Sequence, residues 1–109
     1  MNRNWETLDA LATIMEERKD NDPSTSYVSS LFAKGSHKIA QKVGEEAIET
    51  AMAVAADDND ELIKESADLL FHLMVLLKAR GLDMQHVINE LAKREGVSGL
   101  DEKASRTTR

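Results

Sequence analysis

Residues 61–80 constrain the fold more than any other stretch, because apolar side chains lie on nearly all sides of the helix that they predict. The apolar residues of this helix are Leu62, Ile63, Leu69, Leu70, Leu73, Met74, Leu76 and Leu77. A helix that is apolar all round must be buried by more than one neighbour. We therefore expect a helical bundle in which a second copy of the chain covers part of this helix, most simply as a homodimer.

The rest of the chain also indicates helices, since one proline, five glycines and little β-branched alternation disfavour strands. Helices are predicted over residues 5–19, between a cap at Ser26 and Gly35, and from a cap at Ser36 to about Ala56. A further helix is predicted over 61–80, where Asp58 with Glu61 has the offset of a capping-box-like start, and a last one after a cap at Asp83. The short turn at 57–60 makes the two long helices antiparallel neighbours. The expected fold class is all-α, an antiparallel helical bundle completed by dimerisation.

The core is expected to take in one face of each helix. On the helix over 36–56, the residues expected to face inward are Ile39, Val43, Ala47, Met52 and Ala55. Trp5 is expected to pack in the core as well, rather than against a cofactor.

Composition sets the limits on function. The 109 residues suit one domain, here 1–96, followed by a polar, flexible tail over 97–109. A net charge of −6 argues against a general nucleic-acid binder, and the lack of cysteine excludes disulfides and cysteine-ligated zinc. With neither a signal peptide nor an apolar run long enough for a membrane span, a cytoplasmic protein is expected.

Two acidic pairs, Glu46 with Glu49 and Glu65 with Asp68, lie on the two long helices. Each pair has the spacing i, i+3, which places both carboxylates on one face of a helix, one turn apart. Glu45 adjoins the first pair. Four carboxylates that converged without a cation would repel one another strongly, so their convergence predicts a divalent metal ion.

The ligand type and its neighbours indicate the chemistry of such a site. Carboxylates without soft ligands select Mg²⁺, Mn²⁺ or Ca²⁺ over zinc, and Mg²⁺ keeps positions open for water and phosphate oxygens. Lys38 and Lys42 precede the first pair by successive turns and would neutralise phosphate charge. Metal-assisted hydrolysis of a phosphoanhydride needs no serine, cysteine or threonine nucleophile, and is the reaction class that fits.

Plainer interpretations stay open at this point. Either acidic pair alone is typical of a solvated helix face, and the chain is then a non-catalytic helical interaction module. The position of Glu65 and Asp68 within the most apolar helix favours the metal site. His72 continues their stripe, either as a hydrogen-bonded core residue or in contact with substrate or a ligating acid. Tyr27 opens a segment that either packs or folds over the site.

The motifs resemble those of a known family. Glu45-Glu46-x-x-Glu49, followed after fifteen residues by Glu65-x-x-Asp68, is similar to the signature of the all-α nucleotide pyrophosphohydrolases, the MazG-like superfamily. Within it, the phosphoribosyl-ATP pyrophosphatase family of histidine biosynthesis is the closer match, from about Leu8 to Arg94. Its most specific parts are Pro23-x-x-Ser26-Tyr27, Lys34-Gly35, Lys38-Ile39-x-x-Lys42-x-x-Glu45-Glu46-Ala47-x-Glu49 and Ala67-Asp68-Leu69-Leu70-Phe71-His72-Leu73.

The resemblance implies Mg²⁺-dependent hydrolysis of 1-(5-phosphoribosyl)-ATP to 1-(5-phosphoribosyl)-AMP and pyrophosphate, by a helical bundle assembled as a dimer. The implied metal ligands are Glu46, Glu49, Glu65 and Asp68. Glu45 would act with Glu46 and Glu49 in catalysis, supporting the ligands or positioning water. Lys38 and Lys42 would bind the phosphates. Weaker candidates to lie near the substrate are Ser26, Tyr27, Lys34 and His72.

The sequence departs from the family pattern at two positions. Val28 stands where a threonine often follows the tyrosine, and Phe71 where a tyrosine often precedes the histidine. Family members are also found fused to a cyclohydrolase domain; here we expect the product to pass to a separate phosphoribosyl-AMP cyclohydrolase. The alternative enzyme within the superfamily is a house-cleaning pyrophosphohydrolase for canonical or damaged nucleoside triphosphates.

Overall fold

The computed structural model describes residues 4–95, which form five α-helices and, within that range, no strand. The helices are α1 (Glu6–Arg18), α2 (Tyr27–Lys34), α3 (Ser36–Ala55), α4 (Asn59–Ala79) and α5 (Met84–Arg94). The all-α prediction is therefore confirmed. The predicted tail over 97–109 and the last residue of the predicted domain lie outside the described residues.

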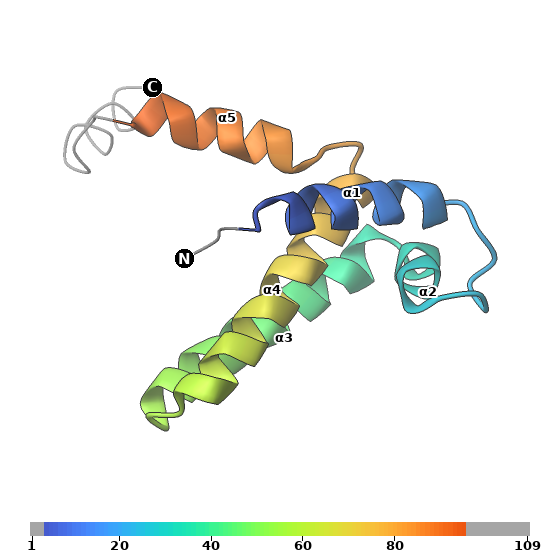
Figure 1. Cartoon of the computed structure of the whole chain (residues 1–109). Coiled ribbons are helices and arrows are strands. Elements are labelled where there is room, and N and C mark those ends of the chain that lie inside the picture. Colours follow the sequence, from blue (N-terminus) through green and yellow to red (C-terminus); the bar gives the residue numbers. More distant parts are fainter. Residues whose placement is uncertain (1–3, 96–109) are drawn as a thin grey trace.

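α3 and α4 form an antiparallel hairpin that is the longest feature of the molecule (Figure 1). α1 and α2 pack at the end of this hairpin where α3 begins and α4 ends, and the turn between α3 and α4 lies at the opposite end. α5 extends away from the other helices. The hairpin thus has an end that other helices cover and an end that they leave open.

Three of the predicted helix caps are present. The hydroxyl oxygen of Ser26 accepts a hydrogen bond from the Ser29 backbone N–H at 3.0 Å, which starts α2. The Asp58 carboxylate accepts one from the Glu61 N–H at 3.0 Å and starts α4. Asp83 caps α5 in the same way. Each side chain satisfies a backbone donor that has no partner within its helix.

The predicted cap at Ser36 is wrong. Ser36 is the first residue of α3 itself, and no side chain caps this helix. Gly35 occupies the capping position with φ 87° and ψ 161°, while its N–H donates to the Phe32 carbonyl at the end of α2. Gly35, at positive φ, both ends α2 and takes the N-cap position of α3. Ser36 therefore falls inside the helix, where its side chain cannot act as the N-cap.

The core lies at the covered end of the hairpin. Its buried residues are Met15, Val28, Leu31, Ile39, Met74 and Val75, contributed by α1 to α4. Ser29, also buried, donates from its hydroxyl to the Arg18 carbonyl at 3.0 Å and so fixes α2 against the end of α1. This contact sets the position of α2 over the hairpin.

The predicted inward face of α3 is only partly correct. Ile39 is buried, but Ala47, Met52 and Ala55 are exposed. Trp5 is exposed too, at the start of α1. α1 and α2 reach only the first turns of α3, so beyond them a single chain offers only α4 as a packing partner.

Candidate functional site

Three of the predicted metal ligands converge in the half of the hairpin nearer its turn. Glu46 and Glu49 on α3 and Glu65 on α4 each place a carboxylate oxygen within 4.8 Å of the others. The helical spacing of Glu46 and Glu49 directs both side chains towards α4, as the sequence pattern indicates. We call these three residues the acidic cluster.

Two oxygens of the acidic cluster lack hydrogen-bond donors. Among residues 4–95, no donor reaches Glu46 Oε2 or Glu65 Oε2, although both atoms are shielded from solvent. The whole of Glu46 is only 5% exposed. Buried acceptors are satisfied in most native proteins, so two unpaired carboxylate oxygens in one cluster suit a bound cation or donor.

The pKa values of Glu65 and Glu46 also indicate that the cluster suits a positive charge. Hydrogen bonding to Glu49, burial and the contact with Glu46 together raise the pKa of Glu65 to about 8. Burial opposes ionisation of Glu46, but hydrogen bonds from Glu65 and Lys42 outweigh it and hold the pKa of Glu46 below its usual range. Near neutral pH, therefore, the metal-free cluster keeps a proton on Glu65 in place of a cation.

The residues present fit a divalent metal ion. All the converging atoms are carboxylate oxygens, which are the ligands of hard cations such as Mg²⁺, Mn²⁺ and Ca²⁺. A bound cation would give the two unpaired oxygens their partner and would replace the proton on Glu65.

Asp68 does not join the acidic cluster. It is exposed, one turn beyond Glu65 on α4 in the direction of α2, and lines a neighbouring hollow together with Glu46. Its side chain is one methylene shorter than that of glutamate, and the i, i+3 step leaves it about 60° round the helix from Glu65. The structure thus brings together three of the four predicted ligands and leaves the fourth beside them.

The hollow beside the cluster measures about 440 Å³ and is lined by Tyr27, Lys42, Glu46, Asp68, Phe71 and His72. We call it the Tyr27 hollow. The Lys42 Nζ lies 3.5 Å from Glu46 Oε1 and 3.9 Å from Glu45 Oε2. These acidic neighbours outweigh the desolvation of Lys42 and raise its pKa, so its ammonium charge is secure. The hollow therefore combines one fixed positive charge with the edge of the acidic cluster.

His72 and Tyr27 join α4 to α2 at this hollow. His72 is 4% exposed; its Nε2 lies 2.9 Å from the Tyr27 hydroxyl oxygen and its Nδ1 2.7 Å from the Asp68 carbonyl oxygen. The Tyr27 ring stacks on Phe71, with centroids 6.1 Å apart and planes at 17°. His72 is therefore a buried, hydrogen-bonded residue, and because it also lines the hollow, its contact with substrate stays a prediction.

The other predicted residues lie further from the cluster. Lys38 is exposed on α3 and Lys34 on the last turn of α2, and neither lines the Tyr27 hollow. Glu45 is exposed and faces Lys42 rather than the cluster. Ser26 has a structural role, since its hydroxyl caps α2 and contacts Ser29.

The sequence interpretation overlooked two residues. Glu61 contributes to the raised pKa of Glu65 and lines a hollow of about 380 Å³ with Glu49, on the side of the cluster towards the turn. Its i, i+4 spacing to Glu65 was the available signal. Phe71 was noted only for the hydroxyl it lacks, yet its ring supports Tyr27.

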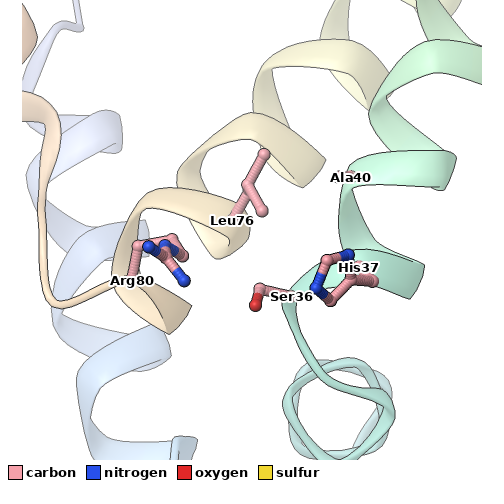
Figure 2. Close-up of a pocket in the computed structure, with 5 residues that line it drawn as sticks. All are labelled: Ser36, His37, Ala40, Leu76 and Arg80. Atoms are coloured by element: carbon pink, nitrogen blue, oxygen red, sulfur yellow. The ribbon is translucent and has the colours of Figure 1, made fainter.

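A further hollow, of about 410 Å³, lies at the covered end of the hairpin. Figure 2 shows Leu76 and Arg80 of α4 opposite Ser36, His37 and Ala40 at the start of α3. Its lining includes no carboxylate, so it offers no ligand set for a hard cation. The acidic cluster and the Tyr27 hollow are therefore the candidate site.

Fold and site together define an all-α protein whose central hairpin carries a carboxylate cluster suited to a divalent cation. A family model described as phosphoribosyl-ATP pyrophosphohydrolase matches residues 8–95. The chain belongs to this family, which confirms the resemblance read from the motifs. None of the described helices is long and apolar enough to span a membrane.

Individual relatives agree with the family match. The chain is 57% identical over 100 residues to a phosphoribosyl-ATP pyrophosphatase from Rhizorhabdus wittichii, covering 92% of this chain and 94% of that one. A protein of the same name from Novosphingobium aromaticivorans is 56% identical over 102 residues, covering 94% and 95%. The histidine biosynthesis bifunctional protein HisIE from Vibrio cholerae is 55% identical over 87 residues, which are 80% of this chain and 41% of that protein.

Proposed function

We propose that this protein hydrolyses 1-(5-phosphoribosyl)-ATP to 1-(5-phosphoribosyl)-AMP and pyrophosphate in histidine biosynthesis, with Mg²⁺ as its cation and Mn²⁺ as an alternative. The observation that carries the proposal is the acidic cluster, whose unpaired buried oxygens lie beside a hollow containing Lys42. The names of the relatives supply the substrate and the pathway.

Glu46, Glu49 and Glu65 would hold the cation, and Asp68 would complete the ligand set from the adjoining hollow. A cation held there would supply Lewis-acid chemistry, activating a water molecule and stabilising the charge that develops as a phosphoanhydride breaks. Glu65 would give up its proton to hold the cation, because only the ionised carboxylate is a good ligand.

Lys42 is the phosphate-binding group that the geometry favours. Its ammonium is held beside Glu46 by the ion pair at 3.5 Å, so it brings positive charge to the edge of the acidic cluster. Glu45 keeps Lys42 in place from the solvent side. Lys38, one turn earlier on α3, would extend the positive charge along the path of the polyphosphate.

A homodimer is the second part of the proposal. The turn half of the hairpin exposes large apolar side chains, namely Ile48, Met52, Val54 and Ile63. α5 exposes Ile88 and Leu91. Exposed apolar side chains in this number favour an interaction surface, and a second copy of the same hairpin is the simplest partner. Light scattering after size-exclusion chromatography tests the dimer.

The setting of the reaction follows from the pathway. Histidine biosynthesis uses soluble nucleotide intermediates, so we place the protein in the cytoplasm. Its product would pass to a separate phosphoribosyl-AMP cyclohydrolase. Membrane fractionation, and reconstitution of the two steps with that enzyme added separately, test these points.

The deciding experiment measures pyrophosphate release from 1-(5-phosphoribosyl)-ATP and from a panel of nucleoside triphosphates, with Mg²⁺ and with chelator. We expect the phosphoribosyl compound to be preferred and chelator to abolish turnover. Preference for an ordinary or damaged triphosphate would instead support the house-cleaning alternative. The absence of any turnover would support the non-catalytic interaction module.

A further inference from the structure

The hydrogen bonds of His72 determine which group carries the proton that it shares with Tyr27. Nδ1 lies 2.7 Å from the Asp68 backbone carbonyl oxygen, which can only accept a hydrogen bond. Nδ1 must therefore carry a proton. In the neutral imidazole the other nitrogen, Nε2, is then an acceptor, and it lies 2.9 Å from the Tyr27 hydroxyl oxygen. Tyr27 accordingly donates its only hydroxyl proton to His72.

The surroundings hold this arrangement in place. His72 is 4% exposed, so water does not compete readily for its ring nitrogens. Phe71 stacks on the Tyr27 ring at 6.1 Å and meets the His72 ring edge-on at 5.3 Å. α2, which carries Tyr27, is itself fixed to α1 through Ser29. The orientation of the tyrosine hydroxyl is thus set by packing as well as by the hydrogen bond.

The consequence concerns what the Tyr27 hollow can bind. With its proton committed to His72, the Tyr27 oxygen offers only lone pairs to a ligand in the hollow. Ionised phosphate oxygens are acceptors, so they gain nothing from Tyr27 and are directed to Lys42, which is a donor only. Tyr27 instead suits an uncharged O–H donor.

We propose that His72 is a positioning residue that makes Tyr27 a hydrogen-bond acceptor for a ribose hydroxyl of the nucleotide. The ribose is favoured over the base because Tyr27 and Lys42 share one hollow, and the sugar is the part of a nucleotide adjacent to its phosphates. This proposal rests on the proposed function. It assigns the two sides of the hollow to two parts of one substrate.

Steady-state kinetics with 1-(5-phosphoribosyl)-ATP test the tyrosine. Tyr27→Phe removes the hydroxyl and keeps the stacked ring, so we expect KM to rise about tenfold, as for one lost hydrogen bond, with kcat within about twofold. The wild type should also discriminate against either the 2′-deoxy or the 3′-deoxy analogue, and Tyr27→Phe against neither. An unchanged KM in Tyr27→Phe, or discrimination that persists in it, would overturn the proposal.

Competition by inorganic pyrophosphate tests the histidine. His72→Leu frees the Tyr27 proton to donate to phosphate oxygens, so we expect a higher KM for substrate together with an unchanged or lower inhibition constant for pyrophosphate. The double variant Tyr27→Phe/His72→Leu should be no worse in KM than either single variant, because both changes remove one interaction. Multiplying effects, or weaker pyrophosphate binding in His72→Leu, would contradict the role.

A conservative variant keeps the test valid if His72→Leu folds poorly. The side-chain amide of His72→Gln can place its oxygen near the position of Nε2 and accept from Tyr27, so KM should return to within about threefold of the wild type. A His72→Gln variant as impaired as a folded His72→Leu variant would count against the proposal. Turnover by the wild type in the same assay separates this outcome from failure of the proposed function.

Discussion

The two ends of the α3–α4 hairpin differ in which side chains they bury and in what covers them. At the covered end, Ile39 and Val75 are almost completely buried, and α1 and α2 close the core over them. At the turn end, the buried positions on α3 are Glu46 and Ala53. Glu65 is the neighbour of Glu46 across the hairpin, and an apolar side chain, Ile63, is exposed. The covered end is closed within one chain, whereas no other helix among residues 4–95 covers the turn end.

This contrast has an energetic meaning. Burying an apolar side chain at the covered end stabilises the fold in proportion to the area removed from water. Placing Glu65 against two other acids opposes folding near neutral pH, because its raised pKa makes the folded state take up a proton that the unfolded chain has lost. A cluster that lowers stability in the free protein is a candidate functional site, because local conflicts of this kind are expected at such sites.

The largest expected effect comes from neutralising the acidic cluster. Substituting a residue that only supports a metal ligand lowers activity by up to roughly a hundredfold. Glu49→Gln, which removes a proposed ligand itself, should lower activity by more than that. Because it also removes like-charge repulsion, the thermal midpoint in chelator should stay equal or rise. Activity assays and calorimetry with and without Mg²⁺ measure both. Glu17→Gln, an exposed change of the same charge on α1, is the matched control and should alter neither.

Truncating an apolar side chain should have the next largest effect, a loss of folding stability that is confined to the covered end. Leu31→Ala, at a side chain 1% exposed, should lower the free energy of unfolding by about 3 kcal/mol. Ile63→Ala, at a side chain 68% exposed, should change it by less than about 0.5 kcal/mol in a monomer. Urea unfolding at several protein concentrations distinguishes the cases. A large, concentration-dependent loss in Ile63→Ala would mean that a second copy covers the turn end.

Much of the hairpin was predictable from local patterns. Helical periodicity, the caps at Ser26, Asp58 and Asp83 and the acidic turn locate the helices to within a few residues. The i, i+3 spacing of the acids then directs Glu46 and Glu49 to the same partner helix. These features depend on residues close in sequence, which is why a single chain suffices to reveal them.

The parts that were missed depend on tertiary packing. Periodicity assigns Met52 and Ala47 to an inward face, but how far α1 and α2 reach along α3 decides whether anything covers them. Likewise, spacing cannot distinguish Asp68 from Glu65 as the third member of the cluster, because side-chain length and the approach of α3 decide it. The bond between Tyr27 and His72 joins residues 45 apart in sequence and has no local signal.

A smaller effect is expected from pH. The pKa of Glu65 is about 8 in the folded, metal-free protein against 4.5 for the free group, so the folded state holds a proton there that the unfolded state has lost. Metal-free stability should therefore fall as pH rises from about 4.5 towards 8. Over the same range Mg²⁺ affinity should rise, by up to about tenfold per pH unit, and level off above pH 8.

Calorimetry in buffers of different ionisation enthalpy measures this coupling directly. Near pH 7, Mg²⁺ binding should release close to one proton, and above pH 9 almost none. Glu65→Gln removes the titrating group and should abolish the release. Proton release that is as large in Glu65→Gln as in the wild type would show that another group titrates.

The smallest expected effect comes from the residues that follow the C-terminal ends of α3 and α4. Asp57 ends α3 with φ 54°, and Gly81 follows α4 with φ 76°; in both turns the next residue donates back to a carbonyl five residues earlier. Glycine adopts positive φ without strain, whereas aspartate does so at a cost. Asp57→Gly should therefore stabilise the metal-free protein by about 0.5–1 kcal/mol, and the reciprocal Gly81→Asp should destabilise it by at least as much. Thermal unfolding in chelator measures both changes. Destabilisation by Asp57→Gly would mean that the Asp57 carboxylate supports the turn end in a way that its backbone geometry does not reveal.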